Sequence, residues 1–349
     1  MKIQFVLPNS NHGWAYPLLK WKAMFKTKGI HISVDNKPEF KSGRKADIII
    51  LSSRYYRAQY KTNGEYLNRL KTDLKADIDK LKDANTKIIF YDLSASSGSR
   101  ALNIINMVDL FLKRQMLKDK KVYADKHAYR QWLSESNYSE GCGEEQLRKL
   151  HNGWNLAYKD YASWPIIDPA KFNVKIFKNP EYYKPEHWQR MLTASYRGKM
   201  KGQTVPQRKA VVESLQELST SHPDSFTTGG IIKKRKFIEE MRNSKAAVSP
   251  FGYGEICYRD MEAFINGCIL VKPSMEHVDT FPNLFIENET YVPVRWDLSD
   301  LKDTLIDIND NYNKYLPIAQ KGQEVFKEAY DNFDYFYEHF VSLLSHLDR

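Results

Sequence analysis

The chain has 349 residues, 42% of them hydrophobic and 13% aromatic, a composition that excludes a disordered protein and suits about two domains. Its 53 Lys and Arg residues outnumber 43 Asp and Glu residues, and the formal net charge of +10 favours an anionic partner such as a nucleotide. Because the positive charge is spread along the chain instead of being concentrated, we predict no nucleic-acid partner.

The first half of the sequence alternates strand-like and helix-like segments. Apolar or alternating patterns predict strands at five places: 2–7, 30–34, 46–51, 87–92 and 107–112. Between two of them, leucine or isoleucine recurs every three or four residues over 67–81, which predicts an amphipathic helix. Strands that alternate with helices indicate a parallel, doubly wound sheet. The following segment, 114–185, is less regular, and we expect peripheral helices and a crossover there.

Reactive side chains follow two of the predicted strands. In doubly wound sheets, ligands bind beyond the carboxyl ends of the strands. His12 follows the first strand, and we interpret it either as a general base or hydrogen-bond donor to substrate, or as a residue that caps the next helix. Asp92 ends the strand at 87–92, and we interpret it either as a base or sugar ligand or as a turn carboxylate. These two residues are the candidate catalytic groups.

Patterns for metal binding are weak. Asp77 and Asp79 form a DxD sequence, but they fall on the polar face of the regular helix, so we interpret them as solvated charges. The three cysteines, at positions 142, 257 and 268, show no metal-ligand spacing. We therefore predict no metal and no cofactor. The cysteine usage, a short N-terminal apolar run and the lack of any apolar run of about 18 residues predict a cytoplasmic protein, with the inner face of the membrane as a further location.

Prolines divide the chain into two parts. A group of them marks the expected interdomain connection: Pro165, Pro169, Pro180 and Pro185. Beyond it, predicted strands at 192–196, 226–232, 246–249, 267–272 and 291–294 again alternate with predicted helices. We predict an N-terminal domain over 1–175, a C-terminal domain over 176–330 and an amphipathic helix over 331–349. This last helix is expected to pack on a domain surface, with peripheral membrane association as the alternative.

A basic loop follows the first strand of the second half. Arg197, Lys199 and Lys201 lie there with two glycines, and Arg208 comes a little later. Basic groups at a strand-to-helix turn offset the negative charge that develops on a departing diphosphate, without a metal. The alternative is an ordinary basic surface loop.

The segment 249–273 has the most unusual pattern of the chain. A loop with Gly252 and Gly254 precedes a predicted helix over 255–266, in which Glu255, Arg259 and Glu262 form one polar stripe. Most other positions of that helix are apolar, which predicts a buried helix with a charged stripe that faces a crevice. The glycines allow a ligand to approach the backbone, and the first helical turn favours phosphate. The alternative is an ion pair between Glu255 and Arg259 on a solvated face.

The second half resembles a known enzyme family. The sequence FGYGEICYRDMEAFINGCILVKP is similar to the signature of group 1 (GT4-like) glycosyltransferases of the GT-B fold, as found in bacterial surface polysaccharide assembly, and TASYRG at 193–198 resembles the start of their donor domain. The resemblance implies two Rossmann-like domains that face a cleft, with the C-terminal helix packing across them. It implies that Glu262 binds the ribose of a nucleotide-sugar and that Arg197 and Lys201 lie near the diphosphate. Where retaining members carry a second glutamate, this chain has Gly254.

The sequence therefore predicts a metal-independent glycosyltransferase. The donor would be a nucleotide-sugar that binds at residues Arg197, Lys199, Lys201, Gly252, Gly254, Glu255, Arg259 and Glu262. The acceptor would be a glycan or glycolipid held by the N-terminal domain. Two alternatives stay open: a sugar-nucleotide 2-epimerase of the same fold, and a basic module that binds nucleic acid or an anionic glycan without catalysis.

Overall fold

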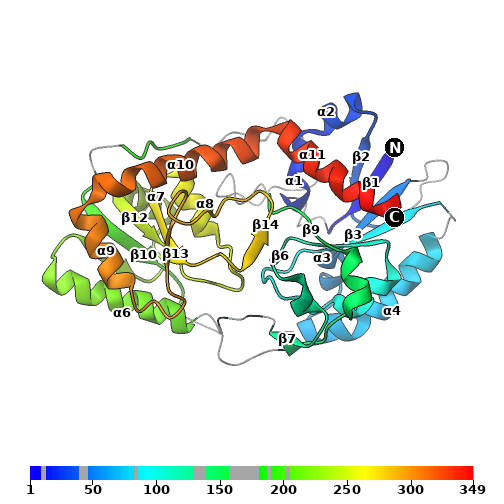
Figure 1. Cartoon of the computed structure of the whole chain (residues 1–349), viewed down its shortest axis with the longest axis horizontal. Coiled ribbons are helices and arrows are strands. Elements are labelled where there is room, and N and C mark those ends of the chain that lie inside the picture. Colours follow the sequence, from blue (N-terminus) through cyan, green and yellow to red (C-terminus); the bar gives the residue numbers. More distant parts are fainter. Residues whose placement is uncertain are drawn as a thin grey trace. The chain divides into compact units, whose positions relative to one another are not determined.

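The computed structural model of the chain describes residues 1–8, 13–38, 46–81, 85–128, 130, 132, 138–156, 181–186, 190–200 and 205–348. The chain forms two compact units, each with its own parallel sheet (Figure 1). The first unit comprises Met1–Lys178, Val278–Pro282 and Tyr330–Arg349. The second unit comprises Asn179–His277 and Asn283–Ala329.

The sheet of the first unit has the strand order β2-β1-β3-β4-β5-β9, and each neighbouring pair is parallel. The strands are β1 (Lys2–Val6), β2 (His31–Asp35), β3 (Ile48–Ser52), β4 (Lys87–Asp92), β5 (Leu110–Lys113) and β9 (Leu150–Asn152). Strand β3 has the sequence IIILS and is buried throughout, because helices or loops cover both faces of a parallel sheet. Five strands were predicted close to these positions, but β9 lies where peripheral helices were expected, so that prediction was wrong there.

Helices and short strands surround this sheet. The helices are α1 (Tyr16–Lys20), α2 (Lys22–Thr27), α3 (Ser53–Arg57), α4 (Asn63–Leu81) and α11 (Phe333–Leu344), with 3-10 turns at Leu102–Met107, Lys120–Tyr123, Glu144–Lys149 and Ser345–Asp348. Antiparallel pairs join β6 (Gln115–Leu117) to β14 (Val278–Thr280) and β7 (His127–Ala128) to β8 (Tyr138–Ser139). Helix α4 buries Leu70 and Leu74 as its spacing predicted. Asp77 on this helix was predicted to be a solvated charge, but it is partly buried and accepts a hydrogen bond from the Tyr56 hydroxyl at 3.1 Å.

The sheet of the second unit has the order β11-β10-β12-β13-β15 and is also parallel. Its strands are β10 (Leu192–Arg197), β11 (Phe226–Gly229), β12 (Ser244–Val248), β13 (Ile269–Pro273) and β15 (Val292–Val294). Its helices are α6 (Val205–Ser221), α7 (Lys234–Arg242), α8 (Tyr258–Ile265), α9 (Leu301–Asp310) and α10 (Tyr312–Asp331), which ends in the first unit. Ala194, Ala246 and Ile269 pack in the core between sheet and helices.

Both sheets share one topological feature that positions ligands. In each, the first strand along the chain lies between the second and the third, so the strand order reverses at that point. The reversal falls between β1 and β3 in the first unit and between β10 and β12 in the second. Ligands of open parallel sheets bind beyond the carboxyl ends of the strands at such a switch point. The loops after these four strands are therefore where a site is expected.

The C-terminal helix packs on the first unit through aromatic rings. Phe336 of α11 is fully buried, and its ring centroid lies 5.4 Å from that of Trp21 and 5.8 Å from that of Trp154. Phe333 and Phe340 contact Phe25 of α2 in the same cluster, and Figure 1 shows α11 beside α1 and α2. The burial of these aromatic side chains stabilises the packing of α11 against the rest of the first unit.

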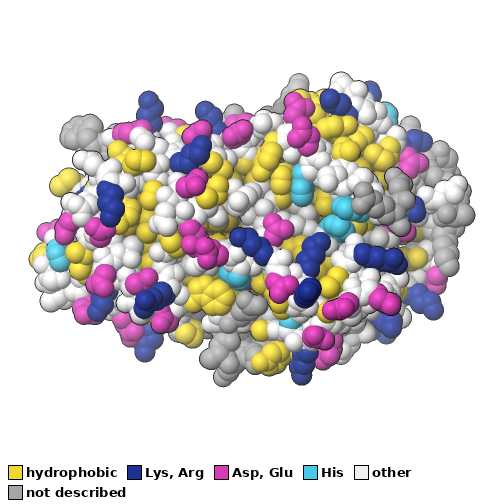
Figure 2. Space-filling model, viewed as in Figure 1, with side chains coloured by type: hydrophobic (Ala, Val, Ile, Leu, Met, Phe, Trp, Pro, Cys, Tyr) yellow, Lys and Arg dark blue, Asp and Glu magenta, His cyan; other side chains and the backbone are white. Residues whose placement is uncertain are grey.

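Two surface properties bear on the membrane and charge predictions. Within the described residues, no helix is both long and apolar enough to cross a membrane. On the face in Figure 2, the described Lys and Arg side chains are interspersed with Asp and Glu side chains, in line with the even spread of charge along the sequence.

Replacing Phe336 tests the aromatic cluster. We expect Phe336→Ala to lower the free energy of unfolding by about 3–5 kcal/mol, because it leaves a cavity among five rings. The control is Val341→Ala on the same helix, which is 38% exposed and should cost about 0.5 kcal/mol or less. Urea denaturation measures both, and equal losses would contradict the packing described above.

Candidate functional site

The switch point of the second unit brings a glycine loop beside a guanidinium group. A Cβ atom placed on Gly252 would lie 3.2 Å from Cys257 Sγ and 3.8 Å from an Arg208 terminal nitrogen, so the loop backbone passes close to that cation. The N–H of Gly252 donates to the Gly254 carbonyl at 3.0 Å, which holds the loop in a tight turn. Arg208 itself donates to the Lys199 carbonyl at 2.8 Å. The sequence had placed Arg208 next to the basic loop without including it among the donor-binding residues.

Three of the predicted basic residues now have defined surroundings. The Arg197 guanidinium binds Glu240 with both Nε and a terminal nitrogen, at 2.7–3.0 Å, and its charge is thereby neutralised. Arg259 donates to the Arg197 carbonyl and lies 4.4 Å from the ring centroid of Tyr196. Lys199 is exposed. In the described part of the chain no carboxylate pairs with Arg208 or Arg259, so their charges stay available to a ligand.

Helix α8 begins later than the sequence predicted. It starts at Tyr258, because the Asp260 carboxylate accepts the Cys257 N–H at 2.9 Å and caps the helix there. Glu255 therefore does not lie on the helix, and the predicted stripe of Glu255, Arg259 and Glu262 is wrong in its first member. Glu255 is instead fully buried, with its carboxylate 4.0 Å from His277 Nε2.

A buried ion pair joins this loop to the sheet, and the sequence analysis missed it. Lys272 Nζ, at the end of β13, lies 2.8 Å from the Asp260 carboxylate and 2.7 Å from the Glu255 carbonyl. The Ser249 hydroxyl donates to the other carboxylate oxygen of Asp260. None of these three side chains is exposed to solvent. The network fixes the start of α8 and the glycine loop to β12 and β13.

The predicted ribose ligand, Glu262, is a half-buried residue of α8. Burial lowers the pKa of the Lys234 ammonium, and the negative charge of Glu262 partly offsets this effect. Lys234 opens α7, the helix that follows β11. Asn266, which directly follows α8, is buried and takes a structural role, because its amide oxygen accepts a hydrogen bond from Arg242 Nε at 3.1 Å.

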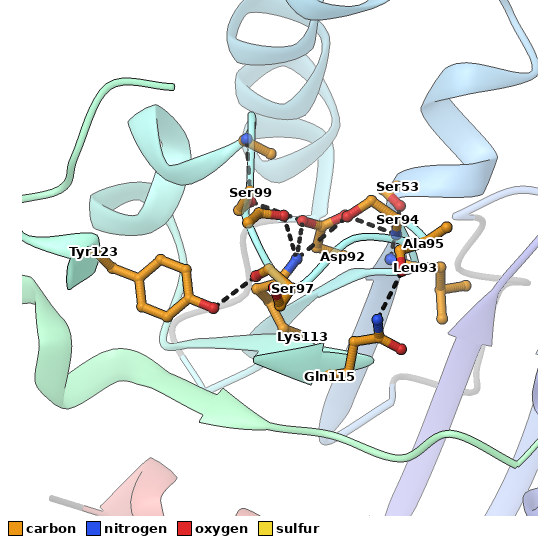
Figure 3. Close-up of polar contacts among 12 residues, drawn as sticks. Ser53, Asp92, Leu93, Ser94, Ala95, Ser97, Ser99, Lys113, Gln115 and Tyr123 are labelled. Carbon is orange, nitrogen blue, oxygen red and sulfur yellow. Dashed lines mark hydrogen bonds and ion pairs between the residues drawn. The ribbon is translucent and has the colours of Figure 1, made fainter. Parts of the chain in front are cut away.

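In the first unit, Asp92 lies at the centre of a second buried network (Figure 3). Its carboxylate accepts hydrogen bonds from Lys113 Nζ at 3.1 Å, the Ser99 hydroxyl at 2.7 Å and the Ser94 N–H at 3.0 Å. Burial by itself would raise the pKa of Asp92, but the Lys113 charge and these donors hold it below its ordinary value. The surrounding serine loop is tied down further where the Tyr123 hydroxyl donates to the Ser97 carbonyl at 2.6 Å. The other catalytic candidate, His12, and the donor candidate Lys201 lie outside the described residues.

The described residues include no group of three or more His, Cys, Asp and Glu side chains placed to hold a metal ion. The cationic side chains near the carboxyl ends of β10 and β12, Arg208 and Arg259, form the candidate anion site of the second unit.

Comparison with known proteins gives the fold. No protein-family model and no curated protein matches the chain. Solved structures do match: an alpha-glucosyltransferase in complex with UDP-glucose and DNA containing an abasic site (10% identity, 98% of each chain covered, TM-score 0.51), and an alpha-glucosyltransferase in complex with UDP (10%, 98% of this chain and 99% of that one, 0.50). TarM matches at 10% identity over 86% of this chain and 55% of its own, with a TM-score of 0.51. The predicted α/β fold class, with two Rossmann-like domains of the GT-B type, is confirmed.

Breaking the buried pair of Lys272 and Asp260 tests its contribution to the fold. We expect Lys272→Met to cost about 3–5 kcal/mol of unfolding free energy, because it leaves the Asp260 charge buried without its partner. Lys302→Met is the matched control, since Lys302 pairs with Glu217 at 2.9 Å on the exposed surface, where a pair contributes about 0–1 kcal/mol. Denaturant titration decides, and a small effect at Lys272 would contradict the role of the pair.

The lowered pKa of Asp92 predicts a pH dependence. An aspartate in the unfolded chain has a pKa of about 3.9. Because the pKa of Asp92 is lower in the folded protein, its ionised form contributes stability that is fully present above about pH 3.9 and is lost as the pH falls through the folded pKa. Asp92→Asn should therefore be less stable than wild type at neutral pH, and the difference should shrink at acid pH. Asp79→Asn, at an exposed position of α4, should run parallel to wild type in urea titrations from about pH 7 to pH 3.

Proposed function

We propose that the chain is a glycosyltransferase that moves a sugar from a nucleotide-sugar donor to an acceptor. The observation that carries the proposal is the pair of guanidinium groups of Arg208 and Arg259. Both donate to carbonyls of the segment 197–199, at the switch point between β10 and β12, and Gly252 lies beside Arg208. The likeness of the fold to alpha-glucosyltransferases in complex with UDP or UDP-glucose supports the same assignment.

In this proposal the second unit holds the nucleotide. Arg208 and Arg259 bind the diphosphate with charge-assisted hydrogen bonds, and exposed Lys199 and the neighbouring Lys201 add positive charge. Their charges stabilise the diphosphate as it leaves the sugar, so the chain's own cations do the work that a divalent metal does in other transferases. Glu262 accepts hydrogen bonds from the ribose hydroxyls, and the glycine loop gives the phosphates access to backbone N–H groups.

The acceptor and its activation belong to the first unit in this proposal. A general base needs a pKa near the working pH, and the ion-paired, hydrogen-bonded Asp92 has its pKa lowered. We therefore propose His12 as the base and Asp92 as the residue that positions the serine loop through Lys113 and Ser99. The acceptor is proposed to be a glycan or glycolipid at the cytoplasmic side of a membrane. Matching alpha-glucosyltransferase structures contain DNA, which counts against the prediction of no nucleic-acid partner, so DNA is a second class of acceptor to test.

Nucleotide binding tests the proposal directly. We expect one nucleoside diphosphate or sugar nucleotide of a panel, UDP first, to raise the melting temperature, because a ligand at about 100 times its Kd stabilises the folded state by about 2.7 kcal/mol. Arg208→Gln and Arg259→Gln should each weaken that nucleotide by roughly 10–100-fold, the effect of one lost charge-assisted hydrogen bond.

Two further variants make the test specific. Glu262→Ala should weaken nucleotides but not inorganic pyrophosphate, because it removes only the ribose contact. Glu217→Ala is the control, since Glu217 is exposed on α6 and pairs with Lys302 on the surface. Lack of any nucleotide effect on the wild-type chain would overturn the proposed function, and an unchanged affinity in Arg208→Gln and Arg259→Gln would move the site elsewhere.

A further inference from the structure

Arg114, at the carboxyl edge of the first sheet, is a buried cation with little compensation. Its side chain is 6% exposed, and its Nε donates to the Asn155 amide oxygen. Its guanidinium lies 4.5 Å from the ring centroid of Trp14. Among the described residues, neither terminal nitrogen of Arg114 has a hydrogen-bond acceptor and no carboxylate pairs with it.

Other buried cations of the described chain have carboxylate or carbonyl partners for their charges. Lys113, the preceding residue, pairs with Asp92, and Lys272 pairs with Asp260. Arg190 is 5% exposed and donates to four backbone carbonyls, at 2.6–3.3 Å. Withdrawing a charge from water is unfavourable unless it gains partners. The two terminal nitrogens of Arg114 are therefore hydrogen-bond donors that contacts within the described residues leave unused, although the residue is nearly buried.

The position of Arg114 is that of a ligand site. It directly follows β5, while Asn155 comes just after β9 and Trp14 lies between β1 and α1. Arg54, which lies in α3 immediately after β3, places its guanidinium 5.9 Å from the same Trp14 ring and donates to the Leu93 carbonyl at 3.3 Å. Both cations thus lie within 6 Å of one ring centroid beside the β1–β3 switch point, where parallel sheets bind ligands.

We propose that Arg54 and Arg114 form an anion-binding site of the first unit that takes a phosphate group carried by the acceptor. The planar guanidinium binds phosphate oxygens through two parallel hydrogen bonds, and stacking on Trp14 together with the bond to Asn155 fixes its plane. Two adjacent cations match the charge of a phosphomonoester, about −1.5 to −2 at pH 7. Assignment of the phosphate to an acceptor rests on the proposed transferase function, whereas phosphate binding itself does not.

Inorganic phosphate is the probe for this site. Its affinity is measured by calorimetry on the full chain at constant ionic strength, in an Arg208→Gln background that weakens the donor site. We expect Arg114→Gln to reduce phosphate affinity by at least tenfold and Arg54→Gln to reduce it several-fold, because each removes one charge-assisted contact. Arg114→Lys keeps the charge but loses the fork and should fall between wild type and Arg114→Gln.

The control is Arg148→Gln, an exposed arginine of the same unit, which should bind phosphate as the background protein does. Arg54 is only half-buried, so Arg54→Gln decides if Arg114→Gln fails to fold. Unchanged phosphate affinity in the folded variants, or no phosphate binding by the background protein, overturns the site. The same variants, made in the wild-type chain, should keep its UDP-induced thermal shift. A lost UDP shift in every protein, wild type included, would instead refute the transferase proposal and leave the phosphate result standing.

Discussion

The geometry of the second unit depends on the buried ion pair between Lys272 and Asp260. Lys272 is the next-to-last residue of a strand whose other residues are apolar, and its ammonium also binds the Glu255 carbonyl. Asp260 in turn caps helix α8 and accepts the Ser249 hydroxyl. One pair of charges therefore sets where β12 ends, how the glycine loop runs and where α8 begins. A loop that carries ligand groups needs such support, because flexible backbone loses binding energy to ordering.

The first unit also contains a buried lysine–aspartate pair, formed by Lys113 and Asp92. Lys113 ends a buried strand, and its ammonium meets Asp92 together with the Ser94 hydroxyl and the Gly98 carbonyl. In both units a lysine at the carboxyl edge of the sheet is neutralised by an aspartate from a neighbouring element, and the loop that lies over them gains fixed backbone contacts. The networks are local to each sheet, so each unit fixes its own loop without contacts from the other network.

The sequence predicted the sheets better than it predicted the site. Continuous apolar runs such as 46–51 and 87–92 have one stable environment, the interior of a parallel sheet, so their strands were found within two or three residues. The start of α8 was misplaced because the apolar periodicity extends the predicted helix back to Glu255. In the structure, the hydrogen bond from the Cys257 N–H to Asp260 makes the helix begin at Tyr258. Arg197 looked equivalent to Arg208 and Arg259, but Glu240, 43 residues away, binds it. Such long-range pairing leaves no local pattern in a sequence. Lys272 in an apolar strand and Asp260 on an apolar helix, by contrast, did leave a local signal, because two opposite charges in apolar segments together imply a buried pair.

Neutralisation of charge separates the basic residues into two sets with different roles. Lys113, Arg190, Arg197 and Lys272 are satisfied by carboxylates or carbonyls, and these cations hold loops and strands together. Arg208, Arg259 and Arg114 each donate one hydrogen bond to the protein, and the described residues offer them no carboxylate. All three lie at the carboxyl edge of a parallel sheet. The formal charge of +10 therefore says little about a partner, since it counts both sets alike. What selects an anionic ligand is the position of the few cations whose hydrogen-bonding capacity the fold leaves unused.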